Sequence, residues 1–166
     1  MTRTADHWIR TLALQPHPEG GCFRETWRSP ERAEGAGLPE RFAGPRSLGT
    51  SIFYLLRAGE RSRLHRLLAD EVWHFHDGGG LRLHVLSPGD VYTELKLGLD
   101  AGAGELPQVV VPNGCWFAAE TAPGVEFALV GCAVAPGFEY GDFELGDRET
   151  LLAAHPRHQD LVLRFT

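Results

Sequence analysis

The sequence predicts an all-β fold, a sandwich or barrel of short antiparallel strands with a short helix near each end. Residues 81–85 and 91–97 alternate apolar and polar side chains, which is the period of half-buried strands. Turns rich in Gly and Pro separate such stretches, as at residues 77–80 and 112–114. No helical periodicity appears between residues 47 and 134, so we expect no parallel α/β sheet.

The size and composition of the chain fit a single domain that covers residues 1–166. Hydrophobic residues make up 43% and charged residues 23%, which is ordinary for a globular protein. The net charge of −6 argues against nucleic acid and against anionic membrane surfaces as partners. The longest nearly apolar run, residues 127–136, is too short to cross a bilayer. Three widely spaced cysteines and the absence of an apolar signal segment predict a cytoplasmic location.

The helices are expected near the two ends of the chain. Residues 4–14 can form a helix because Trp8 and Leu12 share one face, and Pro16 follows as a stop signal. Residues 148–153 can form a second short helix, since Asp147 is a good N-terminal cap.

The strands are expected between these helices. Their segments combine β-branched or aromatic residues with turn signals at both ends: residues 22–28, 51–56, 71–75, 81–85, 91–97, 108–111, 116–120, 125–134 and a terminal strand at 161–165. Residues 29–45, rich in Pro, Gly, Glu and Arg, predict a long surface loop.

Two spaced motifs carry the chemistry that the sequence suggests. They are Gly59, His65, Leu67, Glu71 and Gly78 at the spacing G-x5-H-x-L-x3-E-x6-G, and Pro112, Gly114 and Phe117 at the spacing P-x-G-x-x-F. These motifs resemble the paired motifs of the cupin superfamily, which include the same turn glycines. The resemblance implies a double-stranded β-helix, the cupin jelly-roll barrel.

The ligand positions of metal-binding cupins are only half present in this chain. His65 and Glu71 match two of the four metal ligands of those proteins, whereas Leu67 and Phe117 stand where the other two histidines would be. His74 or His76 could supply a third ligand, but strand alternation places both on the face opposite Glu71. We therefore expect no cofactor. If a divalent metal is bound, His65 and Glu71 are its ligands.

A closer resemblance covers most of the chain. Residues 17–21, 24–26, 50–52, 65–66, 70–75, 112–120 and 134–139 are similar in order and spacing to the Cupin_5 family. This resemblance implies a homodimeric jelly roll with a ligand-sized pocket and no settled activity. It also places the chain near the deoxysugar-nucleotide epimerases, cupins that work without metal.

His65 and Glu71 are the predicted catalytic residues. If the motif holds, both side chains point into the barrel, where a carboxylate beside an imidazole can orient the ring for general base work. The alternative is a structural hydrogen bond. In one interpretation of residues 17–25, they form a lid or complete the pocket, and in the other they form a turn that needs its glycines.

The predicted ligand-binding residues are mostly aromatic, since aromatic walls suit a sugar ring or another flat ligand. They are Ser51, Phe53, Trp73, Phe75, Gln108, Trp116 and Phe117. Alternation then places Tyr54 on the opposite face of its strand from Ser51 and Phe53. The alternative for the aromatic residues is that they fill the barrel, as side chains do in small barrels.

Three hypotheses of function remain open. The first is a metal-independent isomerase or epimerase that uses His65 as the base on a sugar-like substrate. The second is a non-catalytic ligand-binding or storage-type cupin. The third is a metal-dependent enzyme that uses His65 and Glu71. In each case the expected partners are a small-molecule ligand and a second copy of the chain, without nucleic acid or membrane.

Overall fold

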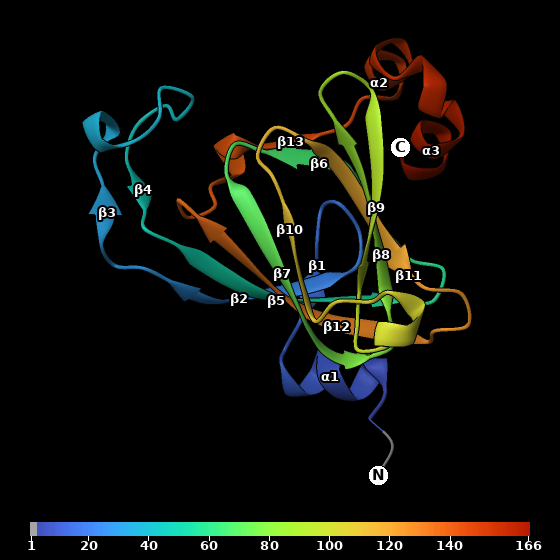
Figure 1. Ribbon diagram of the computed structural model, residues 1–166. Coiled ribbons are helices and arrows are strands. Elements are labelled where there is room, and N and C mark those ends of the chain that lie inside the picture. The colour runs from blue at the N-terminus through green and yellow to red at the C-terminus, as the bar shows by residue number, and fades with distance from the viewer. Residues whose placement is uncertain (1–2) are drawn as a thin grey trace.

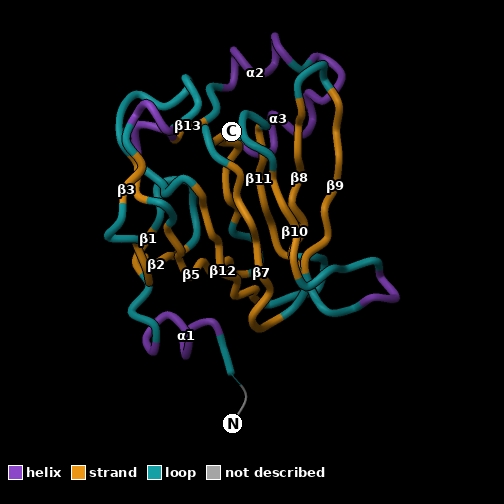
Figure 2. Tube along the Cα trace, turned by 60° about the vertical axis from the view of Figure 1, so that its left-hand side comes forward, coloured by secondary structure: helices purple, strands orange, loops and turns teal. Residues whose placement is uncertain are grey.

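Two antiparallel sheets face each other and form a barrel (Figures 1 and 2). The computed structural model describes residues 3–166. The first sheet has the order β1 (Gln15–Pro16), β2 (Cys22–Arg28), β5 (Thr50–Arg57), β12 (Phe127–Ala135), β7 (Asp70–Gly78) and β10 (Gln108–Val111). The second has the order β13 (Phe143–Leu145), β6 (Arg61–Leu67), β11 (Trp116–Thr121), β8 (Leu81–Ser87) and β9 (Val91–Leu97).

A small arm extends from the barrel between β2 and β5 (Figure 1). It contains the strands β3 (Arg32–Ala33) and β4 (Arg46–Ser47) and the 3-10 turn η1 (Gly35–Gly37). Two further 3-10 turns, η2 (Ala101–Ala103) and η3 (Tyr140–Asp142), connect strands of the barrel. The arm therefore lies where the sequence predicts a long loop.

The helices cover the outer faces of the two sheets. Helix α1 (Ala5–Thr11) packs against the first sheet, in a cluster that includes Leu55 and Leu129. Helices α2 (Arg148–Ala154) and α3 (Gln159–Phe165), joined by the 3-10 turn η4 (Pro156–His158), cover the second sheet at Leu64, Leu86 and Trp116. No helix within residues 3–166 is long and apolar enough to cross a membrane.

The main core lies between the sheets. The strands contribute alternate residues to it, for example Tyr54, Trp73, Leu83, Phe117 and Val130, all at most 1% exposed. Burial of this apolar surface is the main stabilising term of such a barrel. The all-β prediction with short helices toward both ends is confirmed, and so is the Asp147 cap, which accepts from the Thr150 N–H. Thr4 caps helix α1 by accepting from the His7 N–H.

Two element predictions are wrong. The segment 161–165 belongs to helix α3, because Val162 and Phe165 share the face that packs on the second sheet. Strand β6 was not expected, since Arg61, Arg63 and Arg66 make its sequence resemble a loop. Four residues of this strand are nevertheless buried: Ser62, Leu64, His65 and Leu67. A register shift against β11 interrupts the alternation between the two polar ones, Ser62 and His65.

Candidate functional site

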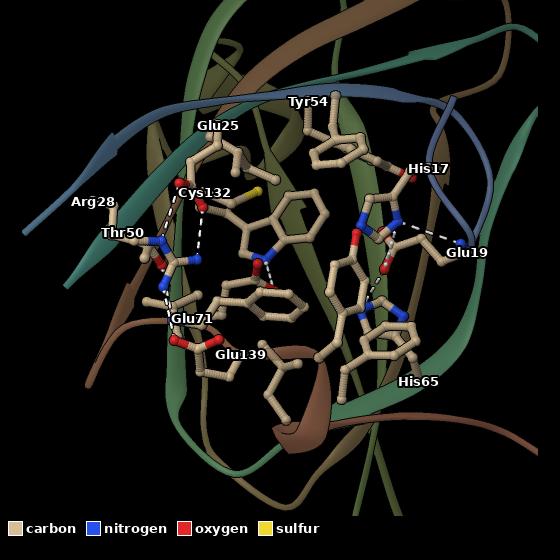
Figure 3. A pocket seen from close by; sticks show the side chains of 18 residues that line it. His17, Glu19, Glu25, Arg28, Thr50, Tyr54, His65, Glu71, Cys132 and Glu139 are labelled. Atoms are coloured by element: carbon tan, nitrogen blue, oxygen red, sulfur yellow. Dashed lines mark hydrogen bonds and ion pairs between the residues drawn. The ribbon is translucent and has the colours of Figure 1, made fainter. Parts of the chain in front are cut away.

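A cavity of about 100 Å³ lies inside the barrel, between β2, β5, β12 and β7 on one side and β6 and β13 on the other. Figure 3 shows the side chains that line it. Its lining combines aromatic, aliphatic and ionisable groups: His17, Glu19, Phe23, Glu25, Arg28, Thr50, Ile52, Tyr54, His65, Leu67, Glu71, Trp73, Cys132, Val134, Phe138, Glu139, Tyr140 and Phe143. Ligand sites in proteins are typically concave and apolar with a few placed polar groups, and this cavity has that character.

Strand register explains which side chains enter the cavity. On the first sheet, Cys132 of β12 lies directly between Ile52 of β5 and Trp73 of β7. Two residues along, Val134 lies between Thr50 and Glu71 in the same way. Cross-strand neighbours share a face, so these two rows form one wall of the cavity.

A tight turn between β1 and β2 brings His17 and Glu19 to the cavity. The N–H of Gly20 donates to the carbonyl of His17 at 3.0 Å, and the backbone of Gly20 has a φ of +117°. A Cβ atom at Gly20 would lie 2.1 Å from the Arg61 carbonyl oxygen, so only glycine lets the turn lie against β6.

Glu19 is the partner of His65. Its Oε2 lies 3.1 Å from His65 Nε2, and its Oε1 accepts from the Ser62 hydroxyl at 2.9 Å. His65 is 2% exposed, and its Nδ1 lies 2.7 Å from the carbonyl oxygen of Arg63. A carbonyl only accepts, so Nδ1 carries a proton. The Nε2 of His65 and the carboxyl of Glu19 then share one further proton, and the pair is neutral overall.

His17 lies on the other side of Glu19 (Figure 3). Its Nδ1 accepts from the backbone N–H of Glu19 at 3.3 Å, and burial lowers its pKa despite the nearby Glu19 charge. The ring is therefore neutral near pH 7 and carries its proton on Nε2. The 3.5 Å approach of Nδ1 to Glu19 Oε2 is accordingly not an ion pair.

Glu71 is a buried carboxyl group with a different partner. Its Oε2 accepts from the indole N–H of Trp73 at 2.9 Å. Burial raises the pKa of Glu71 to about 8, with a further contribution from the charge of Glu19. Glu71 is thus a neutral acid near pH 7. The expectation that Glu71 orients His65 is wrong, because Glu19 takes that role.

An arginine and two carboxylates occupy the end of the cavity opposite His17 (Figure 3). Arg28 donates to both oxygens of Glu25, at 3.1 and 2.8 Å, and to Glu139 at 3.0 Å. Arg28 comes from β2, and Glu139 from the segment between β12 and η3. This group is about one-third to two-fifths exposed and lies toward solvent.

The structure reverses the predicted orientation of β5. Tyr54 lines the cavity and donates its hydroxyl proton to the carbonyl of Gly20 at 2.8 Å, and burial raises its pKa well above the usual value. Ser51 and Phe53 therefore lie on the opposite face, where Phe53 packs in the cluster beneath α1. Both faces of β5 are covered, so apolar alternation alone could not identify the inner face.

Four further residues predicted to bind the ligand do not line the cavity. Three of them lie away from it, and the fourth, Phe117, lies behind its wall. Gln108 is exposed on β10, whose inward residues are Val109 and Val111. Trp116 packs beneath α2 and α3, with Arg66 over its ring. Phe75 packs against the main core and does not line the cavity. Phe117 is buried, with its ring centroid 4.0 Å from that of His65.

Among the nine predicted site residues, His65, Glu71 and Trp73 line the cavity. Sequence reasoning left Glu25 without an assigned role and did not consider Arg28 or Glu139. Glu25 could have been found from the sequence, because it lies in the dense polar segment that begins at His17 and that is part of the Cupin_5 resemblance. The segment forms the predicted turn, and this turn positions His17 and Glu19, which line the cavity of the same chain. A lid, or a contribution to the pocket of a second copy, stays a prediction.

The residues present do not fit the metal site of metal-binding cupins. Leu67 and Phe117 carry no donor atoms, and the Phe117 ring fills the space beside His65. His74 and His76 do not line the cavity. Within residues 3–166, no three His, Cys, Asp or Glu side chains come together as metal ligands would.

A larger hollow of about 520 Å³ lies on the outer face of the second sheet, beside η4 and α3. It is open to solvent, and its ionisable groups hold one another. Glu120 binds Arg164 at 2.5 Å and His84 at 3.2 Å, and His84 also contacts the Tyr92 hydroxyl at 2.9 Å. These contacts attach the C-terminal helix to the sheet, so we assign the site to the enclosed cavity.

Comparison with known proteins gives a consistent family. The family Cupin_5, described as cupin superfamily (DUF985), matches residues 6–146. The uncharacterized protein YML079W of Saccharomyces cerevisiae is 34% identical over 145 residues, which are 81% of this chain and 71% of that protein.

Solved structures resemble the whole chain. Protein SO0799 of Shewanella oneidensis has a TM-score of 0.89 at 42% identity and covers 99% of this chain and 98% of its own. A hypothetical protein from Leishmania major has a TM-score of 0.90 at 33% identity, with 99% of both chains covered. Oxalate decarboxylase from Bacillus subtilis has a TM-score of 0.56 at 14% identity over 91% of this chain and 36% of that chain, a likeness of fold alone.

Proposed function

Because this chain belongs to the Cupin_5 family of the cupin superfamily, whose matched relatives are described as uncharacterized or hypothetical, we propose its function from its own site. The protein binds a small organic molecule in the cavity and moves a proton on it without a metal, as an isomerase or epimerase. One observation carries this proposal: a neutral carboxylic acid, Glu71, and a neutral proton-sharing pair, Glu19 with His65, line the same enclosed cavity.

The two groups suit opposite halves of a proton transfer. Enzymes often separate acid and base roles by placing ionisable groups in different environments. Glu71 can donate a hydrogen bond to a substrate carbonyl oxygen. The carboxylate of Glu19 can take a proton from the adjacent carbon, while His65 holds that carboxylate in place. Both ring nitrogens of His65 are already hydrogen-bonded, so in this geometry the base is the pair and not His65 alone.

The proposed step balances without a co-reactant. The proton leaves carbon for Glu19, and the C–H electron pair becomes the C=C bond of an enol. The carbonyl oxygen receives the proton of Glu71. Return of a proton to the other face or to the neighbouring carbon completes epimerisation or isomerisation.

Exchange of substrate protons in D2O tests the proposal. The probe is dihydroxyacetone, a small hydroxycarbonyl compound of a size suited to a cavity of about 100 Å³. We expect the protein, purified without chelator and shown by elemental mass spectrometry to carry far less than one metal per chain, to speed loss of the C–H signals in 1H NMR. The variants Glu71→Gln and Glu19→Gln should lose at least 100-fold in rate, within the usual range for general acid–base groups.

The matched control is Glu144→Gln, which makes the same change at an exposed residue that pairs with Arg66 outside the cavity. This variant should exchange at the wild-type rate. Wild-type exchange no faster than buffer, with binding retained, would favour the non-catalytic binding or storage-type cupin. The metal-dependent enzyme would instead be favoured if the purified protein carries about one iron, manganese, nickel or zinc ion per chain and loses proton exchange when that metal is removed.

A further inference from the structure

The side chains that face the cavity carry more negative than positive charge, and this excess indicates the class of ligand. At the outer end, the single positive charge of Arg28 meets the two negative charges of Glu25 and Glu139. At the inner end, Glu19 and His65 form a pair that is neutral overall. His17 and Glu71 are neutral near pH 7 for the reasons given above. The lining therefore carries one negative charge in excess.

No positively charged group of the lining is free to bind an anion. The lining residues with basic side chains are Arg28, His65 and the neutral His17. Arg28 makes three hydrogen bonds to carboxylates, and His65 is held by Glu19 and by a carbonyl. An anionic ligand would have to displace a carboxylate from Arg28 and would then face the displaced group. A cation meets no such penalty, because Glu25 and Glu139 have unused lone pairs.

Aromatic residues next to Glu139 in the chain also line the cavity. Phe138 and Tyr140 flank Glu139 in sequence, and both line the cavity together with Phe143. Their ring centroids lie 5.1 to 6.5 Å from one another. Aromatic faces attract organic cations, most strongly where water is partly excluded.

The inner end of the cavity presents a donor without a partner. The His17 side chain is 8% exposed, and its Nε2–H has no hydrogen-bond partner among the described residues. Figure 3 shows the ring between Glu19 and the interior of the cavity. Every buried side-chain polar atom among the described residues has a partner, so this unpartnered Nε2–H is open to the space of the cavity, where it can donate to an oxygen on a ligand. The O–H of neutral Glu71 can donate to such an oxygen as well.

We propose that the cavity takes a small amino alcohol or amino ketone. Its ammonium group lies beside Glu25 and Glu139, and its hydroxyl or carbonyl oxygen faces His17 and Glu71. This inference rests on the proposed function, whose substrate class it names, and it makes Glu25 and Glu139 the residues that select the ligand by charge.

Three probes with the same three-carbon frame test the charge selection by binding alone. They are serinol (2-amino-1,3-propanediol) as the cation, glycerol as the neutral compound and glycerate as the anion. Binding is followed by 15N–1H NMR titration at pH 7 and low salt. We expect serinol to bind at least tenfold more tightly than glycerol, and glycerate to cause no shifts at cavity residues. Tightest binding of glycerate, equal binding of all three, or no binding of serinol would overturn the proposal.

Variants at the outer end sharpen this test. Glu139→Gln and Glu25→Gln should each weaken serinol binding about fivefold to tenfold and leave glycerol unchanged. Arg28→Gln should strengthen serinol binding, because it frees both carboxylates. Glu144→Gln, the exposed control, should change neither affinity. Unchanged serinol affinity in both Glu25→Gln and Glu139→Gln would show that charge at this end does not select the ligand.

The binding measurements and the exchange assay can refute the two proposals independently of each other. Selective serinol binding without proton exchange on any probe would keep the ligand class and remove the enzyme. Proton exchange on dihydroxyacetone with no preference for serinol would keep the enzyme and remove the ligand class.

Discussion

Glu71 and Glu19 line the same cavity but differ in protonation, and the groups around each carboxyl explain the difference. Glu71 accepts one strong hydrogen bond, from Trp73, and a weaker one from the Cys132 thiol, and its cross-strand neighbour Val134 is apolar. Glu19 is bonded to His65 and Ser62 and can share a proton. A carboxyl group with few donors in a buried place stays neutral, which is the behaviour the proposed acid needs.

The state of Glu71 predicts how stability depends on pH. The folded-state pKa of about 8 lies above the 4.5 of a free glutamate side chain, so the unfolded chain loses its proton first as pH rises. The stabilisation is full below pH 4.5 and is lost progressively between pH 4.5 and 8, on the order of 5 kcal/mol at 1.36 kcal/mol per pKa unit. Glu71→Gln should remove this slope and be more stable than the wild type at pH 8, as measured by urea unfolding.

The control for this measurement is again Glu144→Gln, because its carboxylate is exposed and its replacement should leave the slope as in the wild type. Equal pH slopes in the wild type and Glu71→Gln would mean that Glu71 is ionised in the folded protein, and the proposed acid would then be wrong.

At the level of elements, the β1–β2 turn determines whether the cavity exists in its present form. The turn carries His17 and Glu19, and the backbone N–H of Arg63 on β6 donates to the Glu19 carbonyl at 2.8 Å. The turn is therefore attached to the opposite sheet, and Gly20 allows the approach.

Two alanine substitutions separate backbone strain from close contact. Gly20→Ala should destabilise the protein by about 3 kcal/mol or more, because it combines a positive φ with a collision against the Arg61 carbonyl. Gly59 also has a positive φ, +80°, but a Cβ atom there would meet open space, so Gly59→Ala should lower the free energy of unfolding by only about 1 kcal/mol. Urea unfolding gives both values, and equal losses would contradict the close approach of the turn to β6.

Across the whole molecule, a buried ion pair connects the arm to the segment that closes the cavity. Arg46 of β4 donates to both oxygens of Asp142 in η3 at 2.6 Å, and the two side chains are 9% and 6% exposed. The segment from Phe138 to Phe143 supplies four of the cavity residues. The position of those residues thus depends on residues almost one hundred positions earlier in the chain.

Breaking this pair should be costly, whereas replacing both partners should not be. Arg46→Met leaves the Asp142 carboxylate buried without its partner and should destabilise the protein by about 3–5 kcal/mol. The double variant Arg46→Met with Asp142→Leu should recover most of that loss. Thermal unfolding of the wild type, Arg46→Met and the double variant checks this expectation, and a double variant no more stable than Arg46→Met would contradict it.

The all-β class and the Asp147 cap could be predicted from the sequence, because strand alternation, turn glycines and cap residues act over a few neighbouring positions. The family came from the resemblance of the spaced motifs, which also implied that His65 and Glu71 point into the barrel, where both line the cavity together with Trp73. Binding to a second copy of the chain stays a prediction, which sedimentation velocity can test against the monomer mass of 18.3 kDa.

The partner of His65 and the inner face of β5 could not be predicted from local pattern. Glu19 lies 46 positions before His65 and reaches it only because the β1–β2 turn packs on β6. Apolar Phe53 fits either face of β5, since the outer face is covered by the cluster beneath α1, and the side chain of Ser51 is small. The sequence alone determined the all-β class, most of the barrel strands and the family, whereas strand β6 and the C-terminal helix α3 emerged only in the structure. Only the tertiary structure decided which polar groups meet, because those meetings depend on register and on contacts between segments far apart in the chain.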